Sequence, residues 1–346
     1  MATAVVGGIG LLARWSSPSA EWLPQVVAPA LPVLGPLSLP FAVATGAVAL
    51  RTRSAGGGVA TLLLAAVFTA WTLRTSAPPS ADHGPLRVMT LNLGESMQRE
   101  GAVEDYVVQT RPHLLLLQES TFNHGPYAPA VGRLLTLGGY TAYKDSVQTE
   151  PGVAGPRRQV ILSRLPVLDF RAGFLGAEEV HSGVYSRVLV AWEGAEVAVY
   201  NVHLRPFNPR AGWSADRMLD PSVWAQTPKN LRSFFAEHAV ESEALARLVA
   251  AETGPVIVGG DFNAAPDQWG RAVLARTLRE TTGRWLPGAT RPDKVPLVNV
   301  DGIQVSDDWA VADAGVGPSG LSDHRPVSAS LALRREPQAP RPRPDP

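Results

Sequence analysis

The sequence contains no cysteine, and this absence removes two classes of site at once. None of its 346 residues can form a disulfide, and none can bind zinc through a thiolate. A chain without cysteine is compatible with an oxidising compartment outside the cytoplasm, without establishing one.

The chain also lacks an excess of basic residues. Lys+Arg and Asp+Glu both number 31, and lysine occurs only three times. Proteins that grip duplex nucleic acid usually carry a strong positive field over their binding face. The balanced charge therefore argues against a dedicated duplex binder and favours a small or lipid-borne substrate.

Charged side chains are scarce in the first part of the chain. About 20 apolar residues suffice to cross a bilayer core, and two stretches here approach that length. We expect residues 1–74 to form a hydrophobic membrane segment, with transmembrane helices at about 32–50 and 55–73. Two other interpretations remain open. The segment can be a buried hairpin of a soluble protein, or a cleaved signal peptide, although a basic start is missing.

The flanking arginines predict an orientation for this segment. Arg51 and Arg53 lie between the two expected spans, and the positive-inside tendency puts such a loop in the cytoplasm. The chain after Arg74 is then extracytoplasmic, held at the cell membrane. Residues 75–85 are typical of a linker, and the Pro/Arg-rich tail at 335–346 is typical of disorder.

Between residues 86 and 334 the hydrophobic pattern predicts strands that end on polar side chains. We expect strands at 87–93, 114–117, 159–163, 184–192, 196–202, 255–258, 298–305 and 327–333, and helices at 103–110 and from 227 to about 252. Asn92, Glu119, His203 and Asp261 stand at or just past strand ends. A sheet-rich core can bring such ends together on one rim and hold them rigidly.

Six short motifs carry these polar residues in one order along the chain. They are Thr90-Leu91-Asn92, Gln118-Glu119, Asn201-Val202-His203-Leu204, Gly260-Asp261-Phe262-Asn263, Val300-Asp301-Gly302-Ile303 and Ser322-Asp323-His324. Together they supply hard oxygen ligands for a divalent cation, and two imidazoles that can hydrogen-bond or protonate a phosphate. This set of groups is what metal-assisted cleavage of a phosphoester requires.

In this combination and order the motifs resemble those of the endonuclease/exonuclease/phosphatase superfamily, the DNase I-like metal-dependent phosphoesterases. The resemblance covers residues 86–334. It implies an α/β (α+β) fold, a four-layer α/β/β/α sandwich of two packed mixed sheets with the active site at one edge. The hydrophobic leader is similar to that of bacterial membrane-anchored members.

The resemblance also implies a metal site that takes Mg²⁺ or Mn²⁺. Glu119 matches the main metal ligand of the family, with Asn92 beside it. Asp301 completes the expected metal-binding set. It stands where the family usually has an aspartate followed by an aromatic residue, and Gly302 follows it here.

Five further residues match catalytic positions of the family. Asp261 matches the carboxylate that orients or deprotonates the attacking water, and Asn263 matches a residue that contacts the phosphate. His203 matches a phosphate-binding histidine that helps the leaving oxygen depart. His324 matches the histidine near the scissile phosphate, and Asp323 matches an acid that can hydrogen-bond a catalytic histidine. The sequence leaves open which histidine pairs with which aspartate.

Purely structural roles are the alternative for each of these residues. Asn92, Asp261 and Asp301 can be turn residues, Glu119 a solvated strand end, His203 a core histidine, and Asp323-His324 a helix cap. Substrate contacts are harder to predict. Arg205 begins an aromatic and arginine-containing loop, 205–226, that can overhang the site or simply cover the sheet, and Arg158 is a second candidate phosphate contact.

The sequence therefore predicts a membrane-anchored, divalent-metal-dependent phosphoesterase that cleaves phosphodiester or phosphomonoester bonds by in-line attack of water. Its expected partners are a phosphoester substrate and the bilayer, with no protein partner predicted. One alternative is an extracellular endo- or exonuclease acting on DNA or RNA. Another, from a different class, is an inactive binding module on a membrane anchor.

Overall fold

The computed structural model describes residues 10, 12–18, 22–30, 85–94, 101–120, 128–144, 159–176, 183–206, 221–283 and 288–334. The expected spans at 32–50 and 55–73, the linker core, the tail and Arg158 lie outside these residues. Within the described part of the chain, no helix combines the length and the apolar character needed to cross a membrane.

The described residues contain twelve strands, which form two six-stranded sheets. The first sheet runs in the order β11 (Trp309–Val316), β12 (Val327–Leu333), β1 (Leu86–Asn92), β2 (Leu114–Gln118), β4 (Val160–Ser163) and β3 (Thr141–Tyr143). The second runs β5 (Val167–Phe174), β6 (Val184–Trp192), β7 (Ala195–His203), β8 (Val256–Asp261), β10 (Asp301–Val305) and β9 (Arg279–Glu280). Both sheets are mixed, because β1 pairs with β2 and β7 with β8 in parallel while the other pairs are antiparallel.

The two sheets face each other across a shared apolar core. Leu116 and Ile161 of the first sheet belong to the same buried cluster as Val199 and Ile257 of the second. Gly259 on β8 permits the close approach, since a Cβ there would lie 2.7 Å from a methyl carbon of Leu116. β2 is buried along its whole length, which explains its uninterrupted run of leucines.

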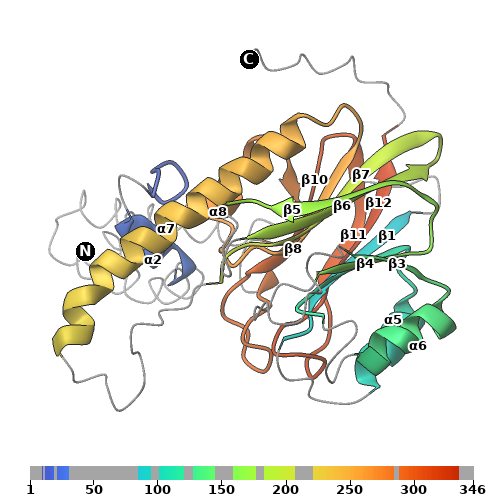
Figure 1. Cartoon of the computed structure of the whole chain (residues 1–346), viewed down its shortest axis with the longest axis horizontal. Helices are drawn as coiled ribbons and strands as arrows, with labels where there is room; N and C mark the ends of the chain where they lie inside the picture. Colours follow the sequence, from blue (N-terminus) through green and yellow to red (C-terminus); the bar gives the residue numbers. More distant parts are fainter. Residues whose placement is uncertain are drawn as a thin grey trace, which may run out of the picture.

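Helices cover the outer face of each sheet and complete four layers. α5 (Ala102–Thr110) and α6 (Ala128–Gly138) pack on the first sheet, while α7 (Pro221–Ala250), α8 (Trp269–Ala272) and the 3₁₀ turn Leu274–Arg276 pack on the second. Figure 1 shows the two sheets between the α5–α6 pair and the long helix α7. The predicted α/β/β/α sandwich is confirmed.

The start of α7 differs from the sequence-based expectation. The pattern Thr227-Pro228 predicts a helix that begins at residue 227, but α7 begins at Pro221 and contains Pro228 in its interior. Proline is favoured in the first turn of a helix, and Pro221 supplies the same signal two turns earlier. The second proline removes one backbone donor without ending the helix.

A short piece of the N-terminal segment contacts the two-sheet sandwich. Helix α2 (Leu23–Val27), followed by the turn Ala28–Ala30, carries Gln25, whose side chain is buried. The backbone N–H of Trp269 donates to Gln25 Oε1 at 2.9 Å, and Gln268 Nε2 donates to the Gln25 carbonyl at 2.7 Å. The predicted membrane segment therefore includes residues that bind the loop leading into α8.

Candidate active site

The polar motifs meet because their strands end at the same rim of the sandwich. Asn92 is the last residue of β1 and Glu119 directly follows the parallel neighbour β2. In the second sheet, His203 at the end of β7 lies opposite Asp261 at the end of β8. Asp301, the first residue of β10, is also the register partner of Asp261. Strand pairing thus places Asn92 beside Glu119 in the first sheet, and His203 and Asp301 beside Asp261 in the second. The packing of the two sheets then brings these two groups to one edge.

Asn92 bridges two carboxylates. Its Nδ2 atom donates to Glu119 Oε1 at 3.1 Å and to Asp261 Oδ2 at 2.9 Å, while its own Oδ1 accepts from the backbone N–H of Gly94 at 2.9 Å. Glu119 has a φ of 52°, in the left-handed region. Non-glycine residues held in that conformation are uncommon and cluster at functional sites.

Asp261 is a buried carboxylate between two histidines. Its Oδ2 atom lies 3.8 Å from His203 Nε2 and 3.9 Å from His324 Nδ1. Burial raises the pKa of Asp261, but the two histidines, with the hydrogen bonds from Asn92 and the Asn263 backbone, outweigh it and lower the pKa below its usual value. The carboxylate is therefore anionic over the whole neutral range, as a group that accepts a proton from water must be.

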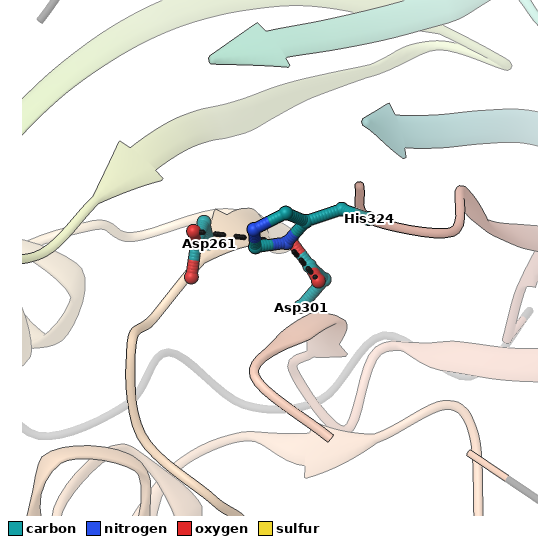
Figure 2. Close-up of side chains that lie close together, drawn as sticks. All are labelled: Asp261, Asp301 and His324. Atoms are coloured by element: carbon teal, nitrogen blue, oxygen red, sulfur yellow. Dashed lines mark hydrogen bonds and ion pairs between the residues drawn. The ribbon is translucent and has the colours of Figure 1, made fainter. Parts of the chain in front are cut away.

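His324 forms a tight pair with Asp301, drawn in Figure 2. His324 Nδ1 lies 2.8 Å from Asp301 Oδ2. Burial lowers the pKa of His324, but the charge and hydrogen bond of Asp301, helped by Asp261, raise it to about 9. The ring is thus an imidazolium near neutral pH. Burial in turn raises the pKa of Asp301.

His203 lies beside the same two carboxylates, and its Nε2 atom makes no hydrogen bond to any described residue. Its Nε2 atom lies 3.7 Å from Glu119 Oε1 and 3.8 Å from Asp261 Oδ2, beyond hydrogen-bond range, and it has no hydrogen-bond partner among the described residues. A buried polar atom without a partner is costly in a protein interior. The nitrogen is therefore available to a ligand that enters between Glu119 and Asp261.

Asn263 stabilises the turn that follows Asp261. Its backbone N–H donates to Asp261 Oδ1 at 2.8 Å, and its side-chain Nδ2 donates to the Leu204 carbonyl at 2.9 Å. Its φ of 47° is again left-handed. Asn263 therefore lies beside Asp261 as predicted, with its amide nitrogen bonded to the segment after β7.

Asp323 and Arg205 occupy other surroundings than the sequence suggests. The acid beside His324 is Asp301, which was expected in the metal site, whereas Asp323 Oδ2 lies 3.3 Å from Arg291 at the protein surface. Asp301 can take this place because β10 starts directly opposite Asp261. Arg205 binds Glu237 at 2.6 Å and Glu241 at 3.2 Å on α7, so the charge of its guanidinium is already compensated.

Two supporting contacts were not assigned from the sequence. Gln118 Nε2 donates to Asn201 Oδ1 at 2.6 Å, and this buried bond joins the two sheets beneath the site. Ser322 Oγ donates to the Asn92 carbonyl at 2.8 Å and accepts from the His324 backbone N–H at 3.2 Å. All of these residues belong to the six motifs, so position within a motif was the available signal.

The set of acidic and amide side chains at this rim fits a divalent cation. Ligand atoms of Asp261, Asp301 and His324 lie within 4.8 Å of one another. A protonated His324 cannot be a ligand, however, and its Nδ1 atom is already bonded to Asp301. Glu119 is the better anchor: its side chain is 19% exposed, and burial raises its pKa. A nearby cation would offset that cost, as Mg²⁺ sites usually combine few carboxylates with water and substrate.

Solved structures share this arrangement of sheets. A mannosyl-6-phosphatase from Bacteroides thetaiotaomicron is 15% identical with a TM-score of 0.53, covering 72% of this chain and 100% of its own. An endonuclease/exonuclease/phosphatase from Bacteroides vulgatus is 15% identical with a TM-score of 0.51, covering 73% and 100%. The human Nocturnin catalytic domain, solved with a bound sulfate anion, is 19% identical with a TM-score of 0.51, covering 72% and 95%.

At such identities these neighbours establish the fold alone. No curated protein matches the chain. A family model described as "Endonuclease/Exonuclease/phosphatase family" matches residues 89–324, which is more than half of the chain and includes all six motifs from Asn92 to His324. The match, the two-sheet sandwich and the cluster of acids and histidines at its rim agree, and the chain belongs to the endonuclease/exonuclease/phosphatase family.

Proposed function

We propose that this protein is a divalent-metal-dependent phosphoesterase that hydrolyses a phosphodiester or phosphomonoester by in-line attack of water. The observation that carries the proposal is the position of Asp261. It is a buried carboxylate with a lowered pKa, and it lies less than 4 Å from both His203 and His324. The Asn92 side chain donates hydrogen bonds to both Asp261 and Glu119 and so links the two carboxylates. A base and two groups that can bind phosphate therefore surround one space.

Asp261 is the proposed acceptor of the proton from the attacking water. The Asn263 N–H and the Asn92 amide each hold one of its two oxygens, which fixes the direction in which it can accept the proton. A positioned general base of this kind typically contributes ~10²–10⁴ in rate. The uncharged amide of Asn92 also separates Asp261 from Glu119 without adding negative charge.

The two histidines are the proposed contacts for the phosphoryl oxygens. His324, kept protonated by Asp301, presents a fixed positive charge to the charge that develops in the transition state. His203 offers its unpartnered Nε2 atom to an oxygen of the substrate. Because such donors are already oriented in the folded protein, they do not need to rearrange as charge develops on the phosphoryl oxygens.

Glu119, with Asn92 beside it, would hold Mg²⁺ or Mn²⁺ near the rim. A bound divalent cation supplies neutralisation of negative charge on the phosphoryl and leaving oxygens. The protein residues would then orient the water, accept its proton and bind the phosphate from the opposite side.

A small or lipid-borne phosphoester is the proposed substrate class. Residues 85–346 contain 27 basic and 29 acidic residues, so the catalytic part carries no basic excess. Binding to long nucleic acid draws most of its affinity from contacts between basic side chains and phosphates. The solved mannosyl-6-phosphatase provides a precedent for a phosphomonoester on this fold. We also propose that residues 1–74 anchor the chain in the cell membrane with the catalytic domain outside.

The decisive experiment measures turnover by the full-length protein in detergent, with Mg²⁺ and with EDTA. The substrates are bis-p-nitrophenyl phosphate, p-nitrophenyl phosphate, phosphoinositide and sphingomyelin vesicles, plasmid DNA and RNA. Asp261→Asn, which keeps the size of the side chain, is the control. Metal-dependent hydrolysis of small or lipid esters that the variant loses supports the proposal. If plasmid is nicked and no other substrate is hydrolysed, the protein is a nuclease. If the wild type turns over no substrate, the alternative of an inactive binding module is favoured.

Orientation needs its own test. An alkaline phosphatase reporter fused after residue 84 is active only outside the cytoplasm, and the proposed topology predicts an active fusion. A reporter of the opposite kind, active only inside, is the matched control. Activity of the second fusion in place of the first would reverse the assignment.

A further inference from the structure

Arg271 on α8 is a fully buried cation. Its Nε atom donates to Glu280 Oε1 at 2.9 Å, and its Nη2 atom donates to the second oxygen of the same carboxylate. Its Nη1 atom donates to Asn299 Oδ1 at 2.7 Å and to the Asn299 carbonyl at 3.2 Å. Burying a charge is expensive unless it is paired and hydrogen-bonded, and here the pairing is complete.

The face of the same guanidinium lies on Phe262. The Cζ atom of Arg271 is 4.9 Å from the centre of the Phe262 ring, which is itself completely buried. Phe262 stands between Asp261 and Asn263 in the sequence, and its backbone N–H donates to the Val300 carbonyl at 2.9 Å. The turn that carries the proposed base is therefore covered by an arginine from another element.

Gly302 makes room for this arginine. A Cβ atom at Gly302 would lie 2.3 Å from Arg271 Nη2, closer than real contacts allow. Gly302 directly follows Asp301, and in the pairing of β8 with β10 it lies opposite Gly260. Gly302 stands where the family usually has an aromatic residue, and the absence of a side chain there leaves room for Arg271.

We propose that Arg271 is a positioning residue for the reaction. Through Phe262 it holds the turn that carries Asp261, and through Asn299 it holds the chain that enters β10 and carries Asp301. Because Asp301 orients His324, Arg271 maintains the separation between the base and the imidazolium without touching substrate. The inference rests on the proposed phosphoesterase function and adds a residue that lies outside all six motifs.

Arginine is the residue type suited to this position. Its planar fork donates in two directions at once while its face stacks on an aromatic ring. Lysine has a similar length and charge but presents a point charge and lacks the fork. Methionine fills a similar volume without charge. Comparing arginine, lysine and methionine at position 271 therefore distinguishes the effects of packing, charge and directional hydrogen bonding.

The test compares Arg271→Met with Arg187→Met in the full-length protein. Arg187 on β6 is a matched control because it is also a buried arginine and also binds a carboxylate, Glu252, through Nε and Nη2 at 2.8 and 2.9 Å. Its Nη1 atom donates to a second acid, Asp169, at 2.9 Å. With Mg²⁺ and bis-p-nitrophenyl phosphate, Arg271→Met is expected to lower kcat by roughly 10²-fold with KM changed less than about twofold, the size of effect that a misplacement near 1 Å produces. Arg187→Met should retain wild-type kcat. Equal losses in both variants, or a loss confined to KM, would overturn the proposal.

A second set of variants keeps the test valid if Arg271→Met does not fold. Arg271→Lys retains the charge and is expected to recover only part of the lost kcat, because it lacks the fork. Gly302→Ala pushes against the guanidinium and should lower kcat by itself. Combined with Arg271→Lys, the alanine should cost less than it does in the wild type, since the shorter head group relieves the collision. Fully additive losses would show that the two positions do not share one contact.

A spectroscopic readout separates this proposal from the proposed function. The His324 Nδ1 proton, bonded to Asp301, is expected to give a downfield NMR signal that is absent in His324→Gln. Arg271→Met should shift or broaden that signal, whereas Arg187→Met should not. If the wild type hydrolyses no ester but the signal responds in this way, the positioning role stands and the phosphoesterase function falls. An unchanged signal in Arg271→Met contradicts the positioning role.

Discussion

Asn92 and Asp261 join the two sheets at the active rim: Asn92 ends β1 of the first sheet, and its Nδ2 atom donates at 2.9 Å to Asp261 Oδ2 at the end of β8 of the second. The same nitrogen bonds Glu119 at 3.1 Å. An uncharged amide is well suited to this place, because a third carboxylate would repel both neighbours and raise their pKa values.

Replacing this amide should be costly for turnover. We expect Asn92→Ala to lower kcat by about 10²–10³-fold, the loss typical for removal of one preorganised donor from an active site. Asn92→Asp, of the same size, should not rescue activity, because the added charge raises the pKa of Asp261. Steady-state kinetics with bis-p-nitrophenyl phosphate provide the measurement. Wild-type kcat in a folded Asn92→Ala protein would contradict the bridging role.

The Asp301–His324 pair predicts a pH dependence with a definite sign. The pKa of His324 is raised from 6.5 to about 9 in the folded protein. The stabilisation that protonated His324 gives to the folded state is therefore fully present below pH 6.5, and it is lost as the pH rises through about 9. Asp301→Asn should return the His324 pKa toward 6.5 and remove this fall in stability at alkaline pH. NMR titration of the metal-free protein, with thermal unfolding from pH 6 to 10, gives both quantities. The same His324 pKa in both proteins would refute the pairing.

Metal affinity should depend on Glu119. We expect Glu119→Gln to raise the Mg²⁺ concentration for half-maximal activity by roughly 10–100-fold, in the range seen when groups supporting a metal site are changed. EDTA should abolish wild-type turnover and added Mg²⁺ should restore it. Glu104→Gln is the control, because Glu104 is a buried acid paired with Arg133 on the helical layer outside the first sheet. An unchanged Mg²⁺ requirement in Glu119→Gln would remove this residue from the metal site.

Gln25 should stabilise the catalytic sandwich although it belongs to the N-terminal segment. Its side chain donates to the Ala13 and Ser16 carbonyls and accepts from the Trp269 N–H. Gln25→Ala leaves these buried groups without partners and should lower the free energy of unfolding by about 1–3 kcal/mol. Arg171→Ala is the control and should cost less than about 1 kcal/mol, because its ion pair with Asp169 is exposed, with 71% of the arginine side chain accessible. Equal melting temperatures for wild type and Gln25→Ala would show that the contact does not persist in solution.

Residues that follow buried strands were the easiest part of the site to predict. Leu114 to Leu117 reads as a strand buried on both faces, so the position of Glu119 at its end follows directly. Edge strands were harder. β5 and β11 were not predicted, because their residues are mostly half-exposed and show no continuous apolar run. The start of α7 was predicted at residue 227 and not at Pro221, because Pro221 and Pro228 can each mark the first turn of a helix.

Local sequence by itself determined the strand ends, the identity of the acids, amides and histidines placed on them, and through these the family and the class of chemistry. Only the tertiary structure decided that Asp301, 23 residues away from His324, binds it in place of the adjacent Asp323. It also decided that Arg271 fills the space beside Gly302. The physical reason is the same in both cases: strand periodicity is a local property of the chain, whereas the pairing of buried charges depends on which distant segments share a desolvated space.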